Sequence, residues 1–339
     1  MFLDNFFKPK KIGIDIGSEK IYFYLEDKGI VISDYTYIAV NTKNDSIFAI
    51  GKEAKEMSGR VPDYIKIIKP VLNGIIYDFE AMQALLNHYF KEIREKYSNL
   101  FGYEALVAIS LDMTEVQKKS FEDILYAIGM KKVYSVPKVI AASVASRCDV
   151  LESIGNMIVE YGASKLEIAA ISTGGIIYSK SLNIGGYDID NAIISQIKNT
   201  YSISIGELMA EKLKKSLSSS DKEKEVVIKG RDLLSGMPKQ VNIRVADIVL
   251  ATEKYIEIIA ENIKLVLENI PTEILSDIYE KGIMLSGDSS RLFNYKKKLK
   301  NLVRLGMYVV DDPATSVIRG LGILIGKMDE YSLVINKIR

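Results

Sequence analysis

Residues 11–25 read KIGIDIGSEKIYFYL, and this stretch decides the fold. Apolar residues run on both sides of a short turn that carries Asp15 and Gly17, a pattern that predicts a β-hairpin rather than a helix. A second stretch, NMIVEYGASKLEIAAISTGGIIYSKSLNIGG at residues 156–186, repeats the order of strand, glycine-bearing turn and strand. The repeat predicts two domains, each of which opens with such a hairpin.

Helical periodicity fills much of the chain between and after the hairpins. Apolar residues recur at helical spacing over residues 80–97, 114–129 and 245–270, so we expect amphipathic helices there. The second of these helices begins with a Thr-x-x-Gln capping box at Thr114 and Gln117. A late strand over residues 282–287 and a closing helix over 316–328 complete an α/β pattern.

Composition limits the function. A chain of 339 residues is longer than one hydrophobic core usually organises, which agrees with two domains. The net charge of +1 argues against a nucleic-acid partner. Cys148 is the only cysteine in the sequence, so no intrachain disulfide can form and a reducing compartment is expected. The sequence has neither an apolar run of membrane-spanning length nor a signal peptide, so we expect a cytoplasmic protein.

The two hairpins, with a third glycine-bearing turn after the late strand, resemble the phosphate-clamping plan of the actin, Hsp70 and sugar kinase superfamily. Within that superfamily the chain resembles MreB, the rod shape-determining bacterial actin family, over nearly its whole length. The most specific match is AIGKEAKEMSGRVPDYIKIIKPVLNGIIYDFEAM at residues 49–82, because generic actin-like ATPases lack this block. Further matches are GIDIGS at 13–18, GIVISD at 29–34, MTEVQ at 113–117, GNMIVE at 155–160, IGGYDIDNAII at 184–194, IGELMAEKLK at 205–214, GRDLLSGMPK at 230–239 and DDPATSVIRGLG at 311–322.

The resemblance implies the α/β actin-like ATPase fold, with two domains that each carry a small subdomain around a nucleotide cleft. Domain I is expected at residues 1–147 plus 320–339, with its small subdomain at about 35–79. Domain II is expected at residues 148–319, with its small subdomain at about 187–244.

The resemblance also implies that ATP or ADP binds in the cleft together with Mg²⁺, which Asp15 would hold through water. The nucleotide-binding residues would come from the two hairpin turns, from the helix after residue 205 and from the third turn. They are Asp15, Gly17, Ser18, Glu19, Lys20, Glu160, Gly162, Ala163, Ser164, Lys165, Glu207, Leu208, Met209, Ala210, Glu211, Lys214, Gly287, Asp288, Ser289 and Ser290.

The chain departs from the family where the family hydrolyses ATP. The family acid that orients the attacking water is replaced within Pro137 and Lys138, and the threonine beside the γ-phosphate is replaced by Lys165. Losing one such group typically slows catalysis by about 10²–10⁴-fold. We therefore expect no catalytic residue at these positions and weak or absent hydrolysis, unless Glu160 or Glu19 compensates. Lys20 and Lys165 are expected to add positive charge beside the phosphates.

Two apolar segments are expected to contact an anionic membrane surface. At the N-terminus four apolar side chains share one face of a short helix, with three lysines behind them. A loop between the first helix and the next strand supplies a second apolar wedge, as it does in the family. The residues of the two segments are Phe2, Leu3, Phe6 and Phe7, and Leu100 and Phe101.

Together these features predict a cytoskeletal protein that polymerises with itself into paired protofilaments on the inner face of the membrane and guides cell shape. Its degenerate loops resemble those expected of a divergent paralogue, as in wall-less helical bacteria where such filaments also serve motility, and paralogous MreB subunits are possible partners. The alternative is an active actin-superfamily ATPase or a sugar kinase-like phosphotransferase.

Overall fold

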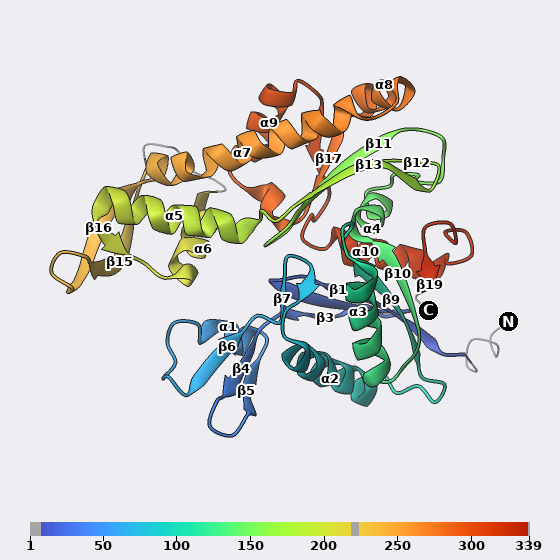
Figure 1. The fold of residues 1–339 in the computed structure, drawn as a ribbon, viewed down its shortest axis with the longest axis horizontal. Coiled ribbons are helices and arrows are strands. Elements are labelled where there is room, and N and C mark those ends of the chain that lie inside the picture. Colours follow the sequence, from blue (N-terminus) through green and yellow to red (C-terminus); the bar gives the residue numbers. More distant parts are fainter. Residues whose placement is uncertain (1–7, 218–223, 338–339) are drawn as a thin grey trace.

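The computed structural model describes residues 8–217 and 224–337. It has two α/β halves, one above the other in Figure 1, and each half is built on its own large sheet. The first sheet has six strands in the order β19-β10-β9-β1-β2-β3. These strands are β1 (Lys10–Ile16), β2 (Lys20–Leu25), β3 (Gly29–Tyr35), β9 (Tyr103–Ile109), β10 (Met130–Pro137) and β19 (Asn336–Lys337).

Two helices cover each face of the first sheet. Helices α2 (Phe79–Lys96) and α3 (Glu115–Ala127) pack on the face that carries Ile12 and Ile14. Helices α4 (Lys138–Ala145) and α10 (Ser316–Gly326) cover the opposite face. The apolar cluster around α4 and α10 also contains residues of the second sheet, so these two helices join the halves (Figure 1).

Helices α4 and α10 cross in very close contact. A Cβ at Gly320 of α10 would lie 1.8 Å from the carbonyl oxygen of Ala141 in α4. Glycine is therefore required at this crossing, because any side chain would collide with backbone. The contact fixes α4 against α10, and with it the residue at which α4 begins, Lys138.

The second sheet has the order β13-β12-β11-β17-β18. Helix α7 (Val245–Glu268) packs its apolar stripe on this sheet, with α8 (Thr272–Lys281) and α9 (Tyr295–Val303) beside it (Figure 1). The strands are β11 (Asn156–Tyr161), β12 (Leu166–Ser172), β13 (Gly175–Leu182), β17 (Ile283–Ser286) and β18 (Met307–Val309).

Each half also carries small elements at one end of its sheet, and these elements flank the space between the halves (Figure 1). In the first half they are β4 (Ile38–Asn41), β5 (Ser46–Ile50), α1 (Lys52–Glu56), β6 (Ile65–Ile68), β7 (Val71–Leu72) and β8 (Ile75–Ile76). In the second half they are α5 (Gly186–Tyr201), β14 (Ile203–Ser204), α6 (Glu207–Ser216), β15 (Glu225–Asp232) and β16 (Pro238–Arg244), and a 3-10 turn, η2 (Asp288–Arg291), follows β17.

The two predicted hairpins are confirmed. Strands β1 and β2 pair antiparallel across the Asp15 turn, and β11 and β12 pair in the same way across the second turn. The capping box is also confirmed, because Gln117 N–H donates to Thr114 Oγ1 at 3.3 Å and Thr114 N–H donates to Gln117 Oε1 at 2.9 Å. Over the described residues, no helix is both long and apolar enough to cross a membrane. The exact domain limits stay a prediction.

Candidate functional site

A cavity of about 760 Å³ lies between the two halves, within the usual size range of small-molecule and cofactor pockets. Both hairpin turns, α6 and the turn after β17 line it. Of the residues predicted to bind nucleotide, all but three line this cavity. Met209 and Ala210 instead face the core of their own subdomain, and Ser290 is buried in η2, because a helix presents only one side to the cleft.

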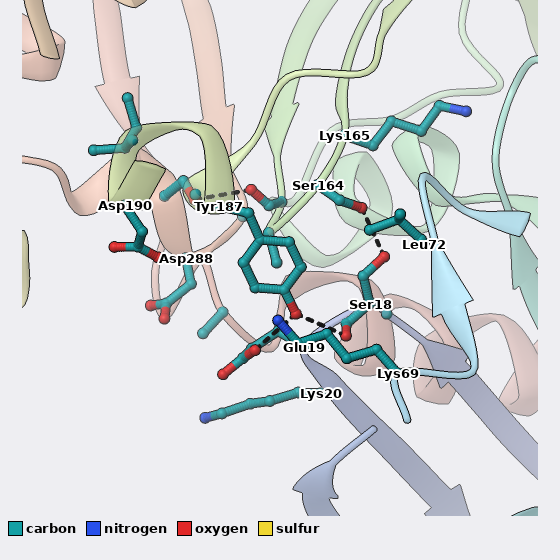
Figure 2. Close-up of a pocket in the computed structure, with 18 of the residues that line it drawn as sticks. Ser18, Glu19, Lys20, Lys69, Leu72, Ser164, Lys165, Tyr187, Asp190 and Asp288 are labelled. Atoms are coloured by element: carbon teal, nitrogen blue, oxygen red, sulfur yellow. Dashed lines mark hydrogen bonds between the residues drawn. The ribbon is translucent and has the colours of Figure 1, made fainter. Parts of the chain in front are cut away.

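The two hairpin turns have the same geometry. The N–H of Gly17 donates to the carbonyl of Lys20 at 2.9 Å, and the N–H of Gly162 donates to the carbonyl of Lys165 at the same distance. Ser18, directly after Gly17, and Ser164, two residues after Gly162, bring their hydroxyls to 2.6 Å from each other across the cleft (Figure 2). Two facing turns of this kind can hold the oxygens of a phosphate chain between them.

Lys138 lies where the family acid is expected, and it binds another predicted site residue. Its ammonium donates to Asp15 Oδ1 at 2.9 Å and to the carbonyl of Ile16 at 3.0 Å. Burial alone would lower the pKa of Lys138, but Asp15, Glu160 and Glu167 outweigh burial and raise the pKa above its ordinary value. Lys138 is therefore a fixed positive charge at the base of the cleft.

Two further carboxyl groups surround this lysine. Burial raises the pKa of Glu160 to about 8, although Lys138 opposes the shift. Burial also raises the pKa of Glu167 to about 7, while the Leu111 N–H, which donates to its Oε1 at 2.6 Å, lowers it. Glu160 stays a candidate for the compensating acid predicted from the sequence, whereas Glu167, the second residue of β12, was not predicted as a site residue.

Lys165 does not extend toward the two serine hydroxyls. Its ammonium is ion-paired with Asp112 of the first half and donates to the carbonyl of Asn73 at 3.1 Å. In Figure 2 the side chain extends away from Ser18 and Ser164. The Lys165 charge that was predicted beside the phosphates therefore joins the two halves instead. Lys20, the other lysine predicted to add charge there, lines the cavity, and its ammonium lies 5.6 Å from the ring centroid of Tyr35.

The third turn packs directly on the second hairpin. Gly287 has a φ of 80°, and a Cβ there would lie 2.3 Å from the carbonyl oxygen of Tyr161. The hydroxyl of Ser289 donates to the carbonyl of Gly162 at 2.9 Å, which ties the two turns together. Asp288 also lines the cavity, and its role in nucleotide binding stays a prediction.

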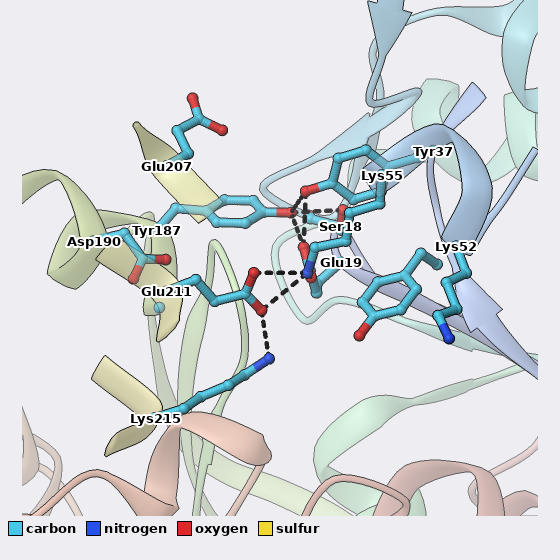
Figure 3. Close-up of polar contacts among 12 residues, drawn as sticks. Ser18, Glu19, Tyr37, Lys52, Lys55, Tyr187, Asp190, Glu207, Glu211 and Lys215 are labelled. Carbon is cyan, nitrogen blue, oxygen red and sulfur yellow. Dashed lines mark hydrogen bonds and ion pairs between the residues drawn. The ribbon is translucent and has the colours of Figure 1, made fainter. Parts of the chain in front are cut away.

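Ion pairs close the cleft at its mouth, where α6 of the second half meets α1 and the residue after β6 of the first. Lys69 contacts Glu207 at 3.2 Å, and Lys55 contacts both Glu211, at 2.8 Å, and Glu19 (Figure 3). Burial alone would lower the pKa of Lys55, but the two acids raise it overall. Three predicted site residues are thus held by lysines that the sequence did not single out.

Two tyrosines reinforce this closure. The hydroxyl of Tyr187 lies 2.8 Å from Glu19 Oε2 and 2.9 Å from the carbonyl of Ser18 (Figure 3). The hydroxyl of Tyr37 lies 2.9 Å from the same Glu19 oxygen. Tyr187 stands at the start of α5, within the IGGYDIDNAII match, and that match was the only sequence signal for it.

Lys214, also predicted in the site, binds within the second half. It donates to Asp190 Oδ2 at 2.7 Å and to the carbonyl of Gly186 at 2.8 Å. Burial raises the pKa of Asp190 to about 6, and Lys214 opposes the shift. The pair fixes α6 against α5 on the wall of the cavity.

The donor set at Asp15 does not fit Mg²⁺. Magnesium prefers six oxygen ligands in octahedral geometry and binds mostly through carboxylates, phosphates and water. Here Asp15 Oδ1 already accepts a hydrogen bond from the Lys138 ammonium, so a metal ion bound at this carboxylate would lie beside a fixed positive charge. Elsewhere in residues 8–217 and 224–337, no group of three or more acidic, histidine or cysteine side chains is arranged to hold a metal ion.

The predicted membrane segments lie partly outside the described residues. Phe2, Leu3, Phe6 and Phe7 fall there. Leu100 is 98% exposed and Phe101 is half-buried, in a loop held by Asn99, which accepts a hydrogen bond from Phe101 N–H at 3.2 Å. The same Asn99 side chain reaches the carbonyl of Lys8 at 3.4 Å. The described chain therefore begins next to the exposed loop.

Comparisons with known proteins agree with this architecture. MreB of Escherichia coli K12 is 30% identical over 94% of each chain. MreB5 of Spiroplasma citri, solved bound to ADP, superposes with a TM-score of 0.90 at 27% identity, over 96% of this chain and 98% of that one, and the same protein has also been solved with AMPPNP. A double-helical filament of MamK shares the fold with a TM-score of 0.78 at 17% identity, over 94% and 99% of the two chains. The family model described as MreB/Mbl protein matches residues 9–333, and the chain therefore belongs to the MreB/Mbl family and has its actin-like fold.

Proposed function

We propose that this chain is a cytoskeletal protein that binds an adenine nucleotide between its halves and polymerises with itself to guide cell shape. The observation that carries the proposal is the pair of matched turns at Gly17 and Gly162, which face one cavity. Relatives named as cell shape-determining proteins, and a structural relative solved with ADP and AMPPNP, support it.

Nucleotide binding is tested by thermal unfolding with ADP and with AMPPNP. A ligand that binds only the folded state raises the melting temperature by mass action. We expect Ser164→Asp to abolish the shift, because its carboxylate would repel phosphate between the turns. Ser179→Asp on β13, which does not line the cavity, should keep it. No shift for the unaltered protein at millimolar nucleotide would contradict the proposal.

Hydrolysis is proposed to be slow, because an ammonium replaces the acid and Lys165 is committed to Asp112. Phosphate release under polymerising conditions should be at least about 10²-fold slower than in an active family member. A Lys138→Glu, Lys165→Thr double variant should release phosphate faster than the unaltered protein. Lys132→Glu, on the exposed side of β10, should leave the rate of phosphate release unchanged. Rapid release by the unaltered protein would instead point to an active ATPase with Glu160 as its acid, and phosphate transfer to sugars would point to a phosphotransferase.

Slow hydrolysis has a consequence for the proposed filaments. Subunits that do not hydrolyse their ATP lack the reaction that loosens ageing polymers. The filaments should be long-lived, or they should depend on a more active paralogous subunit for disassembly. Negative-stain microscopy with and without ATP, on anionic lipid, tests polymerisation, and the absence of filaments under all conditions would contradict it.

Attachment to the inner face of the cell membrane is proposed from the loop at Leu100. Its exposed leucine lies next to the start of the described chain, so the two apolar segments can enter one bilayer together. Deleting residues 1–7 and changing Leu100 and Phe101 to serine should release the protein from anionic liposomes. Leu333→Ser, which removes a leucine that is 75% exposed elsewhere, should not. Unchanged co-sedimentation of the combined variant would refute the attachment.

A further inference from the structure

The contact between Lys138 and Asp15 is shielded from solvent. The Lys138 side chain is 14% exposed and the Asp15 side chain 10%, so the ion pair belongs to the base of the cleft rather than to its surface. The ammonium donates both to the carboxylate and to the carbonyl of Ile16 on the same strand end. Ion pairs in such surroundings are screened much less than surface pairs.

The helix that carries Lys138 cannot easily move it away. Lys138 is the first residue of α4, whose next six residues are all buried. The Gly320 crossing holds this helix against α10 at backbone contact. The free N–H groups at a helix N-terminus add positive potential at the same place. Both the side chain and its helix therefore put positive charge beside Asp15.

The surroundings match those of a bound cation. Asp15, Glu160 and Glu167 all act electrostatically on the lysine and favour its charged form. Asp15 is the carboxylate through which the resemblance places Mg²⁺. An ammonium and a divalent ion so close to one carboxylate would repel each other, and the ammonium is covalently attached to the chain.

We infer that Lys138 is a built-in cation in place of the divalent metal, so that this cleft binds nucleoside di- and triphosphates without Mg²⁺. The inference rests on the proposed nucleotide binding. It specifies the ligand as the nucleotide without a bound metal ion. Lys20 lines the same cavity and supplies further positive charge for the phosphates. The hydroxyls of Ser18 and Ser164 lie between the turns as neutral hydrogen-bonding partners.

Isothermal titration calorimetry of the full chain with ADP, in excess EDTA and in millimolar Mg²⁺, tests the inference. We expect the two Kd values to agree within about threefold. Lys138→Ala should lose at least about tenfold in affinity in EDTA and recover it with Mg²⁺. Lys132→Ala, which changes an exposed lysine of β10 outside the cavity, is the matched control and should bind as the unaltered protein does.

A second measurement needs no variant and so does not depend on whether Lys138→Ala folds. Electron paramagnetic resonance of Mn²⁺ titrated into the unaltered protein with ADP should show no more bound metal than ADP holds by itself. Binding of ADP only in the presence of Mg²⁺, or Mn²⁺ immobilised by the protein–ADP complex, would overturn the inference. No ADP binding with or without metal would instead overturn the proposed nucleotide binding.

Discussion

Lys55 is expected to be the main electrostatic link between the two halves. Its side chain is 9% exposed and bridges Glu19 of the first half and Glu211 of the second, which are 20% and 19% exposed. Lys55→Met keeps most of the apolar stem of the side chain and removes the charge. The two carboxylates would then face each other across the cleft without the lysine between them.

The expected loss follows from this geometry. Removing one partner of a buried ion pair usually costs about 3–5 kcal/mol, because the other charge stays buried and unpaired. Here the acids keep about a fifth of their exposure, and Glu211 retains Lys215 at 2.5 Å. We therefore expect Lys55→Met to lower the free energy of unfolding by about 2 kcal/mol, below the fully buried range.

Urea unfolding followed by circular dichroism measures this loss, and the same helix offers a matched control. Lys52 in α1 pairs with Glu56 at 3.8 Å, with side chains 73% and 67% exposed. Lys52→Met should change the free energy of unfolding by less than about 0.5 kcal/mol, as surface pairs do. If the two variants agree within about 0.5 kcal/mol, the cleft ion pairs do not hold the halves together and the reasoning fails.

Three further predictions concern stability. Burial raises the pKa of Glu167 from 4.5 to about 7. Between these two pH values the folded state binds more protons than the unfolded state, so the free energy of unfolding falls as the pH rises. Glu167→Gln should flatten that fall in urea titrations, and an unchanged pH slope would contradict this. Gly320→Ala should lower the free energy of unfolding by about 3 kcal/mol, because the new Cβ would collide with the backbone of Ala141. Gly326→Ala in the same helix, which has open space around it, should leave the stability unchanged. Equal melting temperatures of the two variants would refute the collision. Thr114→Ala should cost about 1 kcal/mol by calorimetry through its lost cap, and no loss would mean that the cap is dispensable.

The sequence predicted the parts of the fold that depend on local patterns. The hairpins at Asp15 and at Gly162 follow from apolar strands around glycine turns, and both form. The same reasoning identified Lys138 as a replacement for an acid. It could not find the partner of that lysine, because Asp15 is 123 residues away and only the packing of α4 on the first sheet brings the two together.

The directions of long side chains were the other feature that could not be predicted from the sequence. Lys165 stands at the position predicted from the sequence, but its ammonium contacts Asp112 and Asn73 of the opposite half. A long flexible side chain has many rotamers, and the choice among them depends on partners that the sequence does not place. For the same reason the match at residues 49–82 contains Lys55 but gave no sign of its partners, which are two of the predicted site residues.

The path of the chain has a consequence for its synthesis. The first sheet contains strands from both ends of the described chain, because β19 pairs with β10, and α10 covers the face of β1. A ribosome therefore releases the entire second half before it releases α10, one of the two helices that cover this face of the first sheet. Until then Gly13, against which Leu321 will pack, and the apolar face around it stay open to solvent. Because transiently exposed apolar surface promotes aggregation, the nascent first half is the stage of biogenesis at which a chaperone would be most needed.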